Sequence, residues 1–394
     1  MKIAFTVPRY GEDIVGGAEE LARKLAENMA ARGHDVDVLT TCARDHFTWK
    51  NSVPEGFSEL NGVTVRRFKA ETNMFSAEYA EIHQKVCNRE VVSYKDQVKW
   101  ISGGLSSPAL YGFIEKKGPE YDCLIFMPYL FGITFRGSSV YPKRSVLLPC
   151  LHDESFAYLD IMKTMFEQCR NVIFNTHPER ELAQRLYGIK GKGTVVGCGF
   201  DKVAADPTRF RSEFKLQSPF LLYAGRREEG KNTPLLIRYF CNYIHKTGRD
   251  LKLVLIGSGK VEIPRRFRHV VVDLGLVSLS NKYNAYAAAE CLCQPSVNES
   301  LSIVLLESWL QGTPALVHAD CAVTRDHCSR SNGGLFFRDY AEFHECLDFL
   351  FENPDIRGKM GGNGMKYVEE NYCWDEVINR LEDALKCEQS CRTR

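Results

Sequence analysis

Two carboxylates that could bind a ligand, Glu299 and Glu307, lie eight positions apart in the second half of the chain. Glu299 falls in a predicted loop, and Glu307 falls in a predicted helix, residues 301–310, that is apolar on nearly every side. An ionised carboxylate only accepts hydrogen bonds, so it requires donors such as the vicinal hydroxyls of a ribose. Since the free N–H groups at a helix start favour a diphosphate, the stretch indicates a nucleotide-sugar site. Two glutamates on a solvated face are the simpler alternative.

Two cations, Arg226 and Lys231, lie in one predicted turn after a strand at residues 220–224. Arginine can pair with phosphate as a fork and lysine as a point charge, so together they suit a diphosphate. Gly257 starts a glycine turn, Gly257-Ser258-Gly259, that lets backbone approach a ligand closely. Because strand ends in an open α/β sheet share one edge, these groups and the carboxylates are predicted to face one ligand. For the cations alone, a solvated charged turn is the alternative.

The first half of the chain holds two further candidates. Gly16 and Gly17 separate a predicted strand at residues 1–7 from a helix at about 18–32, so backbone N–H groups there can meet an anion. A plain tight turn explains the glycines equally well. His152 follows a short predicted strand, at the sheet edge where ligands usually bind. A capping or core histidine is its alternative.

Alternating strands and helices surround these candidates in two successive runs, which predicts two doubly wound, parallel-sheet (Rossmann-like) α/β domains. The predicted strands are at residues 1–7, 35–41, 63–68, 123–127, 146–148, 171–175, 194–196, 220–224, 251–256, 270–274, 291–294, 315–318 and 335–337. A composition change near 196–201 and a polar stretch at 202–218 place the domain boundary. Residues 57–80 and 102–108 are interpreted as loops that recognise an acceptor, with helices within 77–98.

The overall composition narrows the class of protein. With 394 residues, 44% hydrophobic and 26% charged, the chain suits two or three globular domains. A balance of 51 basic and 50 acidic residues argues against a dedicated nucleic-acid binder. Neither a signal peptide nor a membrane span is recognised, which indicates a cytoplasmic protein and leaves peripheral contact with the inner face of the membrane open. The fifteen cysteines are irregularly spaced, so we expect reduced thiols and no metal site.

Taken in order, these motifs resemble the retaining, GT-B-type glycosyltransferases called family 4 (glycosyl transferases group 1), over nearly the whole chain. The resemblance lies in Val15-Gly-Gly-Ala-Glu19, Arg32-Gly-His-Asp-Val36, Gly225-Arg226 with Lys231, Pro295-Ser296 through Glu299-x7-Glu307 to Gly312-Thr-Pro314, and Tyr372-Cys-Trp374. The segment with two glutamates is its most specific part. Ser302 departs from the pattern, because the family often has glycine there.

The resemblance implies a GT-B architecture of two domains facing across a cleft. Residues 1–198 would form an acceptor-binding domain, completed by a C-terminal helix at about 374–394, and residues 199–373 would bind the nucleotide sugar. The implied catalytic residues are Glu299, Arg226, Lys231 and His152. The implied substrate- and nucleotide-binding residues are Gly16, Gly17, Gly257, Val277, Leu301, Ser302, Ile303 and Glu307.

Each of these residues has an implied role. Glu307 would hold the ribose, while Arg226 and Lys231 would neutralise the leaving diphosphate. Glu299 and His152 would lie at the donor sugar, with the amides of residues 301–303 at the sugar and phosphates. Gly17 would approach the phosphate or the acceptor, and the base would lie against backbone near Val277.

The implied reaction moves a hexosyl group from a UDP- or GDP-sugar to a glycan, lipid-linked or small-molecule acceptor, in cell-surface polysaccharide synthesis. It would retain configuration and need neither a metal nor a cofactor. One alternative is another GT-B-fold enzyme, a sugar-nucleotide 2-epimerase or a glycan phosphorylase, although no cofactor-lysine motif is recognised. A second alternative is a non-catalytic nucleotide-sugar-binding protein, which we would expect to lack one of Arg226, Lys231, Glu299 or Glu307.

Overall fold

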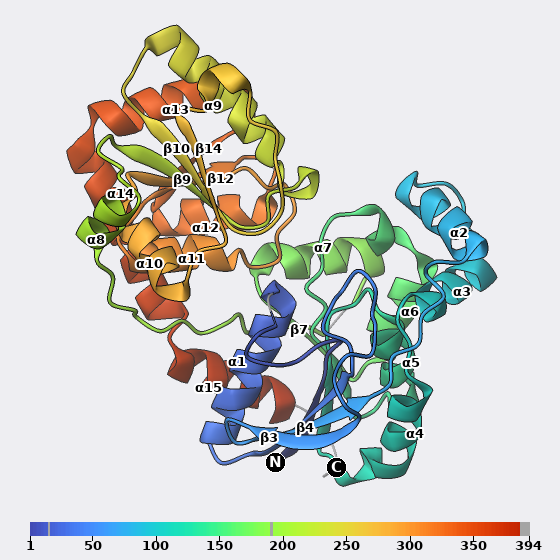
Figure 1. Ribbon diagram of the computed structural model, residues 1–394. Helices are drawn as coiled ribbons and strands as arrows, with labels where there is room; N and C mark the ends of the chain where they lie inside the picture. Colours follow the sequence, from blue (N-terminus) through green and yellow to red (C-terminus); the bar gives the residue numbers. More distant parts are fainter. Residues whose placement is uncertain (15, 190–191, 387–394) are drawn as a thin grey trace. The chain divides into compact units, whose positions relative to one another are not determined.

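The computed structural model describes residues 1–14, 16–189 and 192–386 (Figure 1). Val15, the first residue of the predicted glycine loop, and the end of the predicted C-terminal helix beyond 386 lie outside the described residues. The chain divides into two compact units, one comprising Met1–Gly199 with the chain from Trp374 onward, and the other Phe200–Cys373. The chain therefore passes between the units twice.

The first unit is built on an eight-stranded sheet in the order β3-β4-β2-β1-β5-β6-β7-β8. Its strands are β1 (Lys2–Thr6), β2 (Asp35–Thr41), β3 (Gly56–Leu60), β4 (Val63–Phe68), β5 (Cys123–Phe126), β6 (Ser145–Leu147), β7 (Asn171–Phe174) and β8 (Thr194–Val195). Every neighbouring pair is parallel except β3 and β4. The strand order reverses between β1 and β5, which places a topological switch point there.

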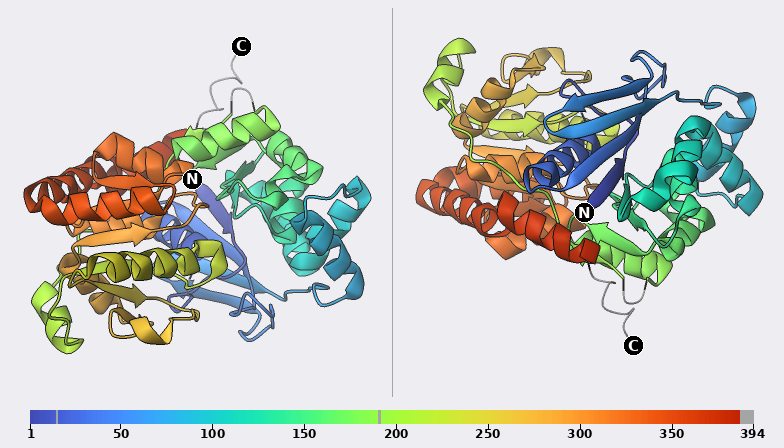
Figure 2. Two further views of the ribbon diagram at one scale, coloured as in Figure 1. Left: turned by 90° about the horizontal axis from the view of Figure 1, so that it is seen from above. Right: turned by 90° about the horizontal axis from the view of Figure 1, so that it is seen from below.

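Helices cover this sheet from segments far apart in the sequence. Helix α1 (Gly17–Ala31) packs beside α15 (Trp374–Lys386), as Figure 2 shows. The imidazole of His34 lies 2.9 Å from the carboxylate of Glu382 on α15 and helps hold that helix in the first unit. The remaining helices of the unit are α2 (Ala77–Cys87), α3 (Tyr94–Gly104), α4 (Pro108–Lys117), α5 (Gly132–Val140), α6 (Asp160–Gln168) and α7 (His177–Tyr187). Apolar side chains of α2, α3, α4, α6 and α7 share one core with the sheet.

The second unit is built on a six-stranded, fully parallel sheet in the order β11-β10-β9-β12-β13-β14. Its elements are β9 (Phe220–Ala224), β10 (Lys252–Ile256), β11 (Val271–Gly275), β12 (Cys291–Gln294), β13 (Ala315–His318), β14 (Gly334–Phe337), and helices α8 (Pro207–Glu213), α9 (Thr233–Thr247), α10 (Leu279–Ala288), α11 (Ile303–Leu310), α12 (Ala322–Ser331), α13 (Tyr340–Glu352) and α14 (Pro354–Asn371). Helices α9 and α13 pack on one face, and α10, α11 and α12 lie on the other (Figure 1). The switch point lies between β9 and β12.

The predicted fold class, two parallel-sheet α/β domains, is confirmed, and the errors in the predicted elements fall mainly between residues 56 and 168. Part of the predicted loop at 57–80 is strand β3, which forms a hairpin with β4 through the Asn61-Gly62 turn. Its side chains are nearly all exposed, so they carry no apolar pattern. Helices α4, α5, α6, α8 and α12 were not predicted, and α3 extends into the predicted loop at 102–108. That the domains face each other across a cleft stays a prediction.

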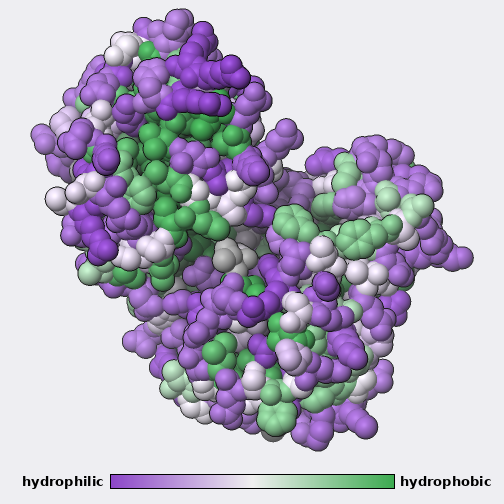
Figure 3. Space-filling model, viewed as in Figure 1, coloured by the Kyte–Doolittle hydropathy of each residue, from purple (hydrophilic) through white to green (hydrophobic). Residues whose placement is uncertain are grey.

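The surface of the molecule is mostly hydrophilic in the view of Figure 3, with apolar side chains gathered in smaller patches. Among the described residues, no helix is both long and apolar enough to span a membrane.

Candidate functional site

A lysine–glutamate pair lies at the switch point of the second sheet. Lys231 ends a 3-10 turn, Glu229–Lys231, that follows β9, and Glu299 lies in the loop after β12. The Nζ atom of Lys231 lies 2.8 Å from Oε1 of Glu299, and the amide of Gln294 donates to the same oxygen at 3.1 Å. The lysine side chain is 22% exposed and the glutamate 11%. Because ligands of open α/β sheets bind at the switch point, this pair is placed to meet one.

Arg226, the second predicted cation, has a different setting. Its side chain is 52% exposed and pairs with Glu228 at 3.3 Å. Its neighbour Arg227 is buried, pairs with Asp273, and donates to the carbonyl of Gly259 at 2.7 Å. Arg227, which was not singled out from the sequence, therefore fastens the turn after β9 to the turn after β10.

Gly257 lies in the turn after β10, in the left-handed region with φ of 129°. A Cβ atom added there would lie 1.9 Å from the carbonyl oxygen of Gly225. Packing of two backbone turns therefore accounts for this glycine, whether or not a ligand also approaches it.

Glu307 is buried and lies on α11, which contacts α10. One carboxylate oxygen accepts hydrogen bonds from Lys282 Nζ at 2.8 Å and from the Tyr283 hydroxyl at 3.3 Å. The other accepts from the Tyr286 hydroxyl at 3.0 Å. We did not predict these three donors from the sequence, because we expected Glu307 to bind only ligand hydroxyls. Lys282 and Tyr286 are four residues apart on one helix face, and this spacing is a sequence signal that could have indicated them as a pair. Val277, expected near the base, is half-buried in the loop leading into α10.

The helix that carries Glu307 begins at Ile303, two residues later than predicted. Ser302 before it has φ of 64°, in the left-handed region, which explains why glycine suits this position. Among the described residues its buried hydroxyl oxygen has no hydrogen-bond partner. The Leu301 carbonyl lies 3.1 Å from Nε2 of His327, whose other nitrogen lies 3.1 Å from the Tyr367 hydroxyl. Burial lowers the pKa of His327 to about 4, so this imidazole is neutral near pH 7.

In the first unit, the two glycines at the start of α1 differ. A Cβ atom at Gly16 would lie 2.1 Å from the carboxylate of Glu19, which pairs with the buried Arg9 at 2.5 Å. A Cβ atom at Gly17 would meet no described atom within 4 Å. A Cβ atom at Gly16 would therefore displace Glu19 from its pair with Arg9, whereas the space at Gly17 is open to a ligand.

His152 lies after β6, as predicted, in a half-buried position. Its Nδ1 atom lies 3.9 Å from the carboxylate of Glu154, which accepts a hydrogen bond of 2.7 Å from the Tyr129 hydroxyl. Gly17 and His152 thus follow β1 and β6, on either side of β5 at the carboxyl edge of one sheet.

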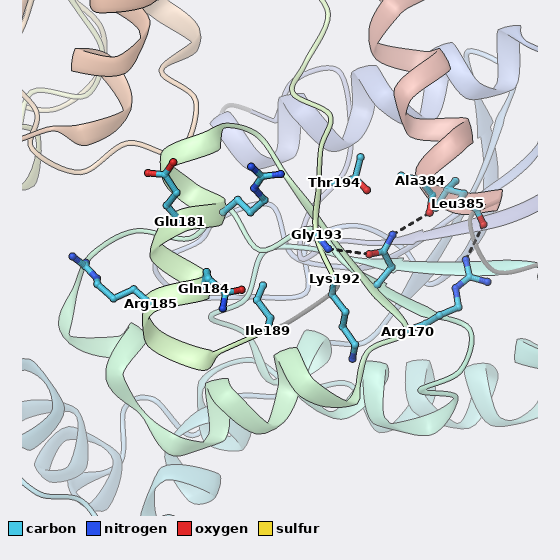
Figure 4. Close-up of a pocket in the computed structure, with 12 residues that line it drawn as sticks. Arg170, Glu181, Gln184, Arg185, Ile189, Lys192, Gly193, Thr194, Ala384 and Leu385 are labelled. Carbon is cyan, nitrogen blue, oxygen red and sulfur yellow. Dashed lines mark hydrogen bonds between the residues drawn. The ribbon is translucent and has the colours of Figure 1, made fainter. Parts of the chain in front are cut away.

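A hollow of about 670 Å³ also opens in the first unit, between α7, β8 and α15 (Figure 4). None of the predicted site residues line it. Two of its polar side chains bind backbone within the unit: Asn171 donates to the Ala384 carbonyl and Arg170 to the Leu385 carbonyl, both at 3.0 Å. We therefore assign the site to the strand ends and not to this hollow.

The cysteines of the described residues are free thiols, and no group of three or more His, Cys, Asp or Glu side chains in that part of the chain could hold a metal ion.

Known proteins similar to this chain bear on its fold and family. Residues 205–367 match the family model described as Glycosyl transferases group 1. The chain is 25% identical over 411 residues to the uncharacterised glycosyltransferase MJ1607 of Methanocaldococcus jannaschii, with 98% of each chain covered. Its fold is similar to that of sucrose-phosphate synthase from Thermosynechococcus elongatus, with a TM-score of 0.73, 16% identity and 99% of each chain covered. It is also similar to Anabaena HepE in complex with UDP and glucose, with a TM-score of 0.68, 14% identity, and 98% and 100% covered. The two units have the GT-B fold.

Proposed function

We propose that this protein is a glycosyltransferase that moves a hexosyl group from a nucleoside-diphosphate sugar to a glycan, lipid-linked or small-molecule acceptor, with retention of configuration. The observation that carries the proposal is the Lys231–Glu299 pair at the switch point of the second sheet, within the segment that matches the transferase family. HepE, a structural neighbour, was solved with UDP and glucose, which supports a UDP-sugar donor. Cell-surface polysaccharide is the destination we propose.

Breaking the bond between sugar and phosphate requires groups that stabilise charge on the departing diphosphate. Lys231 and Arg226 supply cations, and the N–H groups at the start of α11, near Ile303, supply fixed dipoles. Glu299 holds the Lys231 ammonium in one position through their 2.8 Å contact, and its remaining acceptor capacity serves a donor-sugar hydroxyl. The chemistry proposed is electrostatic stabilisation without a protein nucleophile.

Glu307 is proposed to bind the ribose hydroxyls, with the base near Val277. The carboxylate already accepts from Lys282 and two tyrosines, so ribose hydroxyls add to these bonds or displace one of them. The partly exposed Lys282, 24% accessible, is the donor most readily displaced. In the first unit, His152 is proposed to act on the donor sugar and Gly17 to allow close approach of phosphate or acceptor.

The reaction is proposed to proceed without a metal, because the two cations and the helix start supply positive charge themselves. Activity should therefore persist after treatment with EDTA. Loss of activity that Mg²⁺ or Mn²⁺ restores would contradict this part of the proposal.

The test begins with calorimetry of the full chain against a panel of UDP-, GDP- and ADP-sugars. The donor that binds is then incubated with and without candidate acceptors, and released nucleotide and sugar products are measured. Transfer to an acceptor supports the proposal. Epimerised nucleotide sugar formed without acceptor would overturn it in favour of an epimerase, and tight binding with neither transfer nor hydrolysis would favour a binding protein.

A further inference from the structure

We propose that Glu179 is a positioning residue that fixes the loop carrying His152 against the end of the neighbouring strand; the inference rests on the proposed role of His152. Glu179 lies in the first turn of α7, directly after β7. It is 1% exposed, although a glutamate in the first turn of a helix is usually solvated.

The carboxylate of Glu179 joins two strand ends. One oxygen accepts the backbone N–H of Leu151, the residue before His152, at 2.6 Å. The other accepts the backbone N–H of Asn175, at the end of β7, also at 2.6 Å. Two short bonds to rigid backbone fix both the distance and the direction between the loops.

This arrangement extends an ordinary helix cap. Thr176 caps α7 by accepting the N–H of Glu179 at 3.3 Å, and its backbone N–H in turn bonds to the Glu179 carboxylate, as in the reciprocal cap of a threonine and a glutamate three residues later. Here the glutamate also reaches a loop 28 residues earlier in the chain. A glutamate needed only for the helix start would not have to contact that loop.

The loop that Glu179 holds is under backbone strain. Cys150 has φ of 51°, a conformation that costs a residue other than glycine free energy and persists only where its surroundings enforce it. The side-chain amide of Asn175 donates to the Cys150 sulfur at 3.7 Å, so a second contact ties the same two segments. Strain held in place beside a candidate active residue is typical of a preorganised site.

Two opposing effects act on the pKa of the Glu179 carboxyl. Burial raises the pKa of its carboxyl to about 8, whereas the backbone N–H groups of Asn175, Leu151 and Thr176 favour the ionised form and act against that rise. These backbone N–H groups offset the cost of burying the carboxylate. A substitution that removes one acceptor oxygen should therefore loosen the loop directly.

The test uses Glu179→Gln, which keeps the side-chain size but replaces one acceptor oxygen with an NH₂ group that faces a backbone N–H. Glu181→Gln, on the exposed side of the same helix, is the matched control. We expect kcat of E179Q to fall roughly 10- to 100-fold, as for other partners that orient a functional side chain, while donor Kd changes less than about twofold. E181Q should match the parent. A folded E179Q with parental kcat would overturn the proposal.

A double-mutant cycle with His152→Ala separates positioning from general loss of structure. If Glu179 acts through the His152 loop, E179Q should cost little further activity once His152 is absent. Fully additive losses would overturn the proposal.

A measurement that does not depend on activity separates this proposal from the transferase assignment. The ring resonances of His152 in NMR spectra of the full chain should shift in E179Q and stay unchanged in E181Q. An unchanged His152 signal in E179Q would overturn the positioning role even if the protein transfers sugar. A shifted signal in a protein without transfer would instead fault the proposed function.

Discussion

Two lysine–glutamate pairs in the second unit invite comparison, because a single stretch of chain carries both glutamates. Glu299, before α11, pairs with Lys231, and Glu307, within α11, pairs with Lys282. Both lysines are about a quarter exposed, at 22% and 24%, yet Glu299 is 11% exposed and Glu307 only 3%. Both are lysine–glutamate ion pairs, but the elements that carry them differ.

The first pair joins two loops and the second joins two helices. Lys231 and Glu299 follow β9 and β12 at the switch point, where loops can rearrange around a ligand. Lys282 and Glu307 lie on packed helices α10 and α11, and two tyrosine hydroxyls brace the carboxylate further. We therefore propose that the loop pair stabilises charge during the reaction and that the helix pair holds the nucleotide rigidly.

The largest effect should follow from Lys231→Ala. Removing a cation that stabilises the departing diphosphate should lower kcat roughly 100- to 1,000-fold, as does loss of one donor from an oxyanion hole. Steady-state kinetics with the identified donor measure this, and Lys260→Ala, at an exposed position, is the control. Parental turnover by K231A would remove the loop pair from the mechanism.

Glu307→Gln should chiefly weaken donor binding. Loss of charge-assisted hydrogen bonds to the ribose should raise donor Kd roughly 10- to 100-fold, with a smaller effect on kcat. Calorimetry measures Kd, and thermal unfolding measures the cost of leaving Lys282 unpaired. The double variant E307Q/K282M removes both charges, so it should recover stability while donor binding stays weak. Recovery of donor affinity in the double variant would reduce the helix pair to a structural role.

His327 offers a pH test of the loop between the two carboxylates, since it contacts the Leu301 carbonyl there. Its folded pKa of about 4 lies below the unfolded value of about 6.5, so the unfolded chain binds more protons between these pH values. The stabilising contribution is complete above about pH 6.5 and is lost as pH falls toward 4, which amounts to roughly 2 kcal/mol between pH 7 and pH 5.

Urea unfolding at pH 7 and pH 5 compares the parent with His327→Gln and with His269→Gln, an exposed control. H327Q should show a weaker loss of stability on acidification, and H269Q should follow the parent. Equal pH dependence in all three proteins would mean that His327 does not brace the loop.

The smallest effect is expected from Ser302→Gly, at the junction between the two pairs. Relief of a left-handed backbone conformation should stabilise the protein by up to about 1 kcal/mol, offset in part by the greater entropy of glycine in the unfolded chain. Activity should remain within a few-fold of the parent. A marked loss of donor binding would instead assign the buried Ser302 hydroxyl to the ligand.

Most of the fold was predictable because parallel strands buried on both faces are continuous apolar runs, such as Phe220–Ala224, separated by amphipathic helices. Strand β3 was not predictable in this way, because an exposed edge strand carries no such pattern and is recognised only through its pairing with β4. Helices α4, α5 and α6, between residues 108 and 168, were also missed.

Side-chain types and spacing were enough to nominate Lys231, Glu299 and Glu307, and to place Lys231 and Glu299 at strand ends and Glu307 on the helix that follows, since hydrophobic periodicity determines where strands and helices stop. Only the tertiary structure decided their partners. Lys231 meets Glu299 across 68 residues, Glu307 meets Lys282 across 25, and Glu179 reaches Leu151 across 28. Such pairings depend on strand order and helix packing, which bring distant segments together and leave little trace in local sequence. The sequence thus defined the chemical groups, and the fold determined which of them can act together.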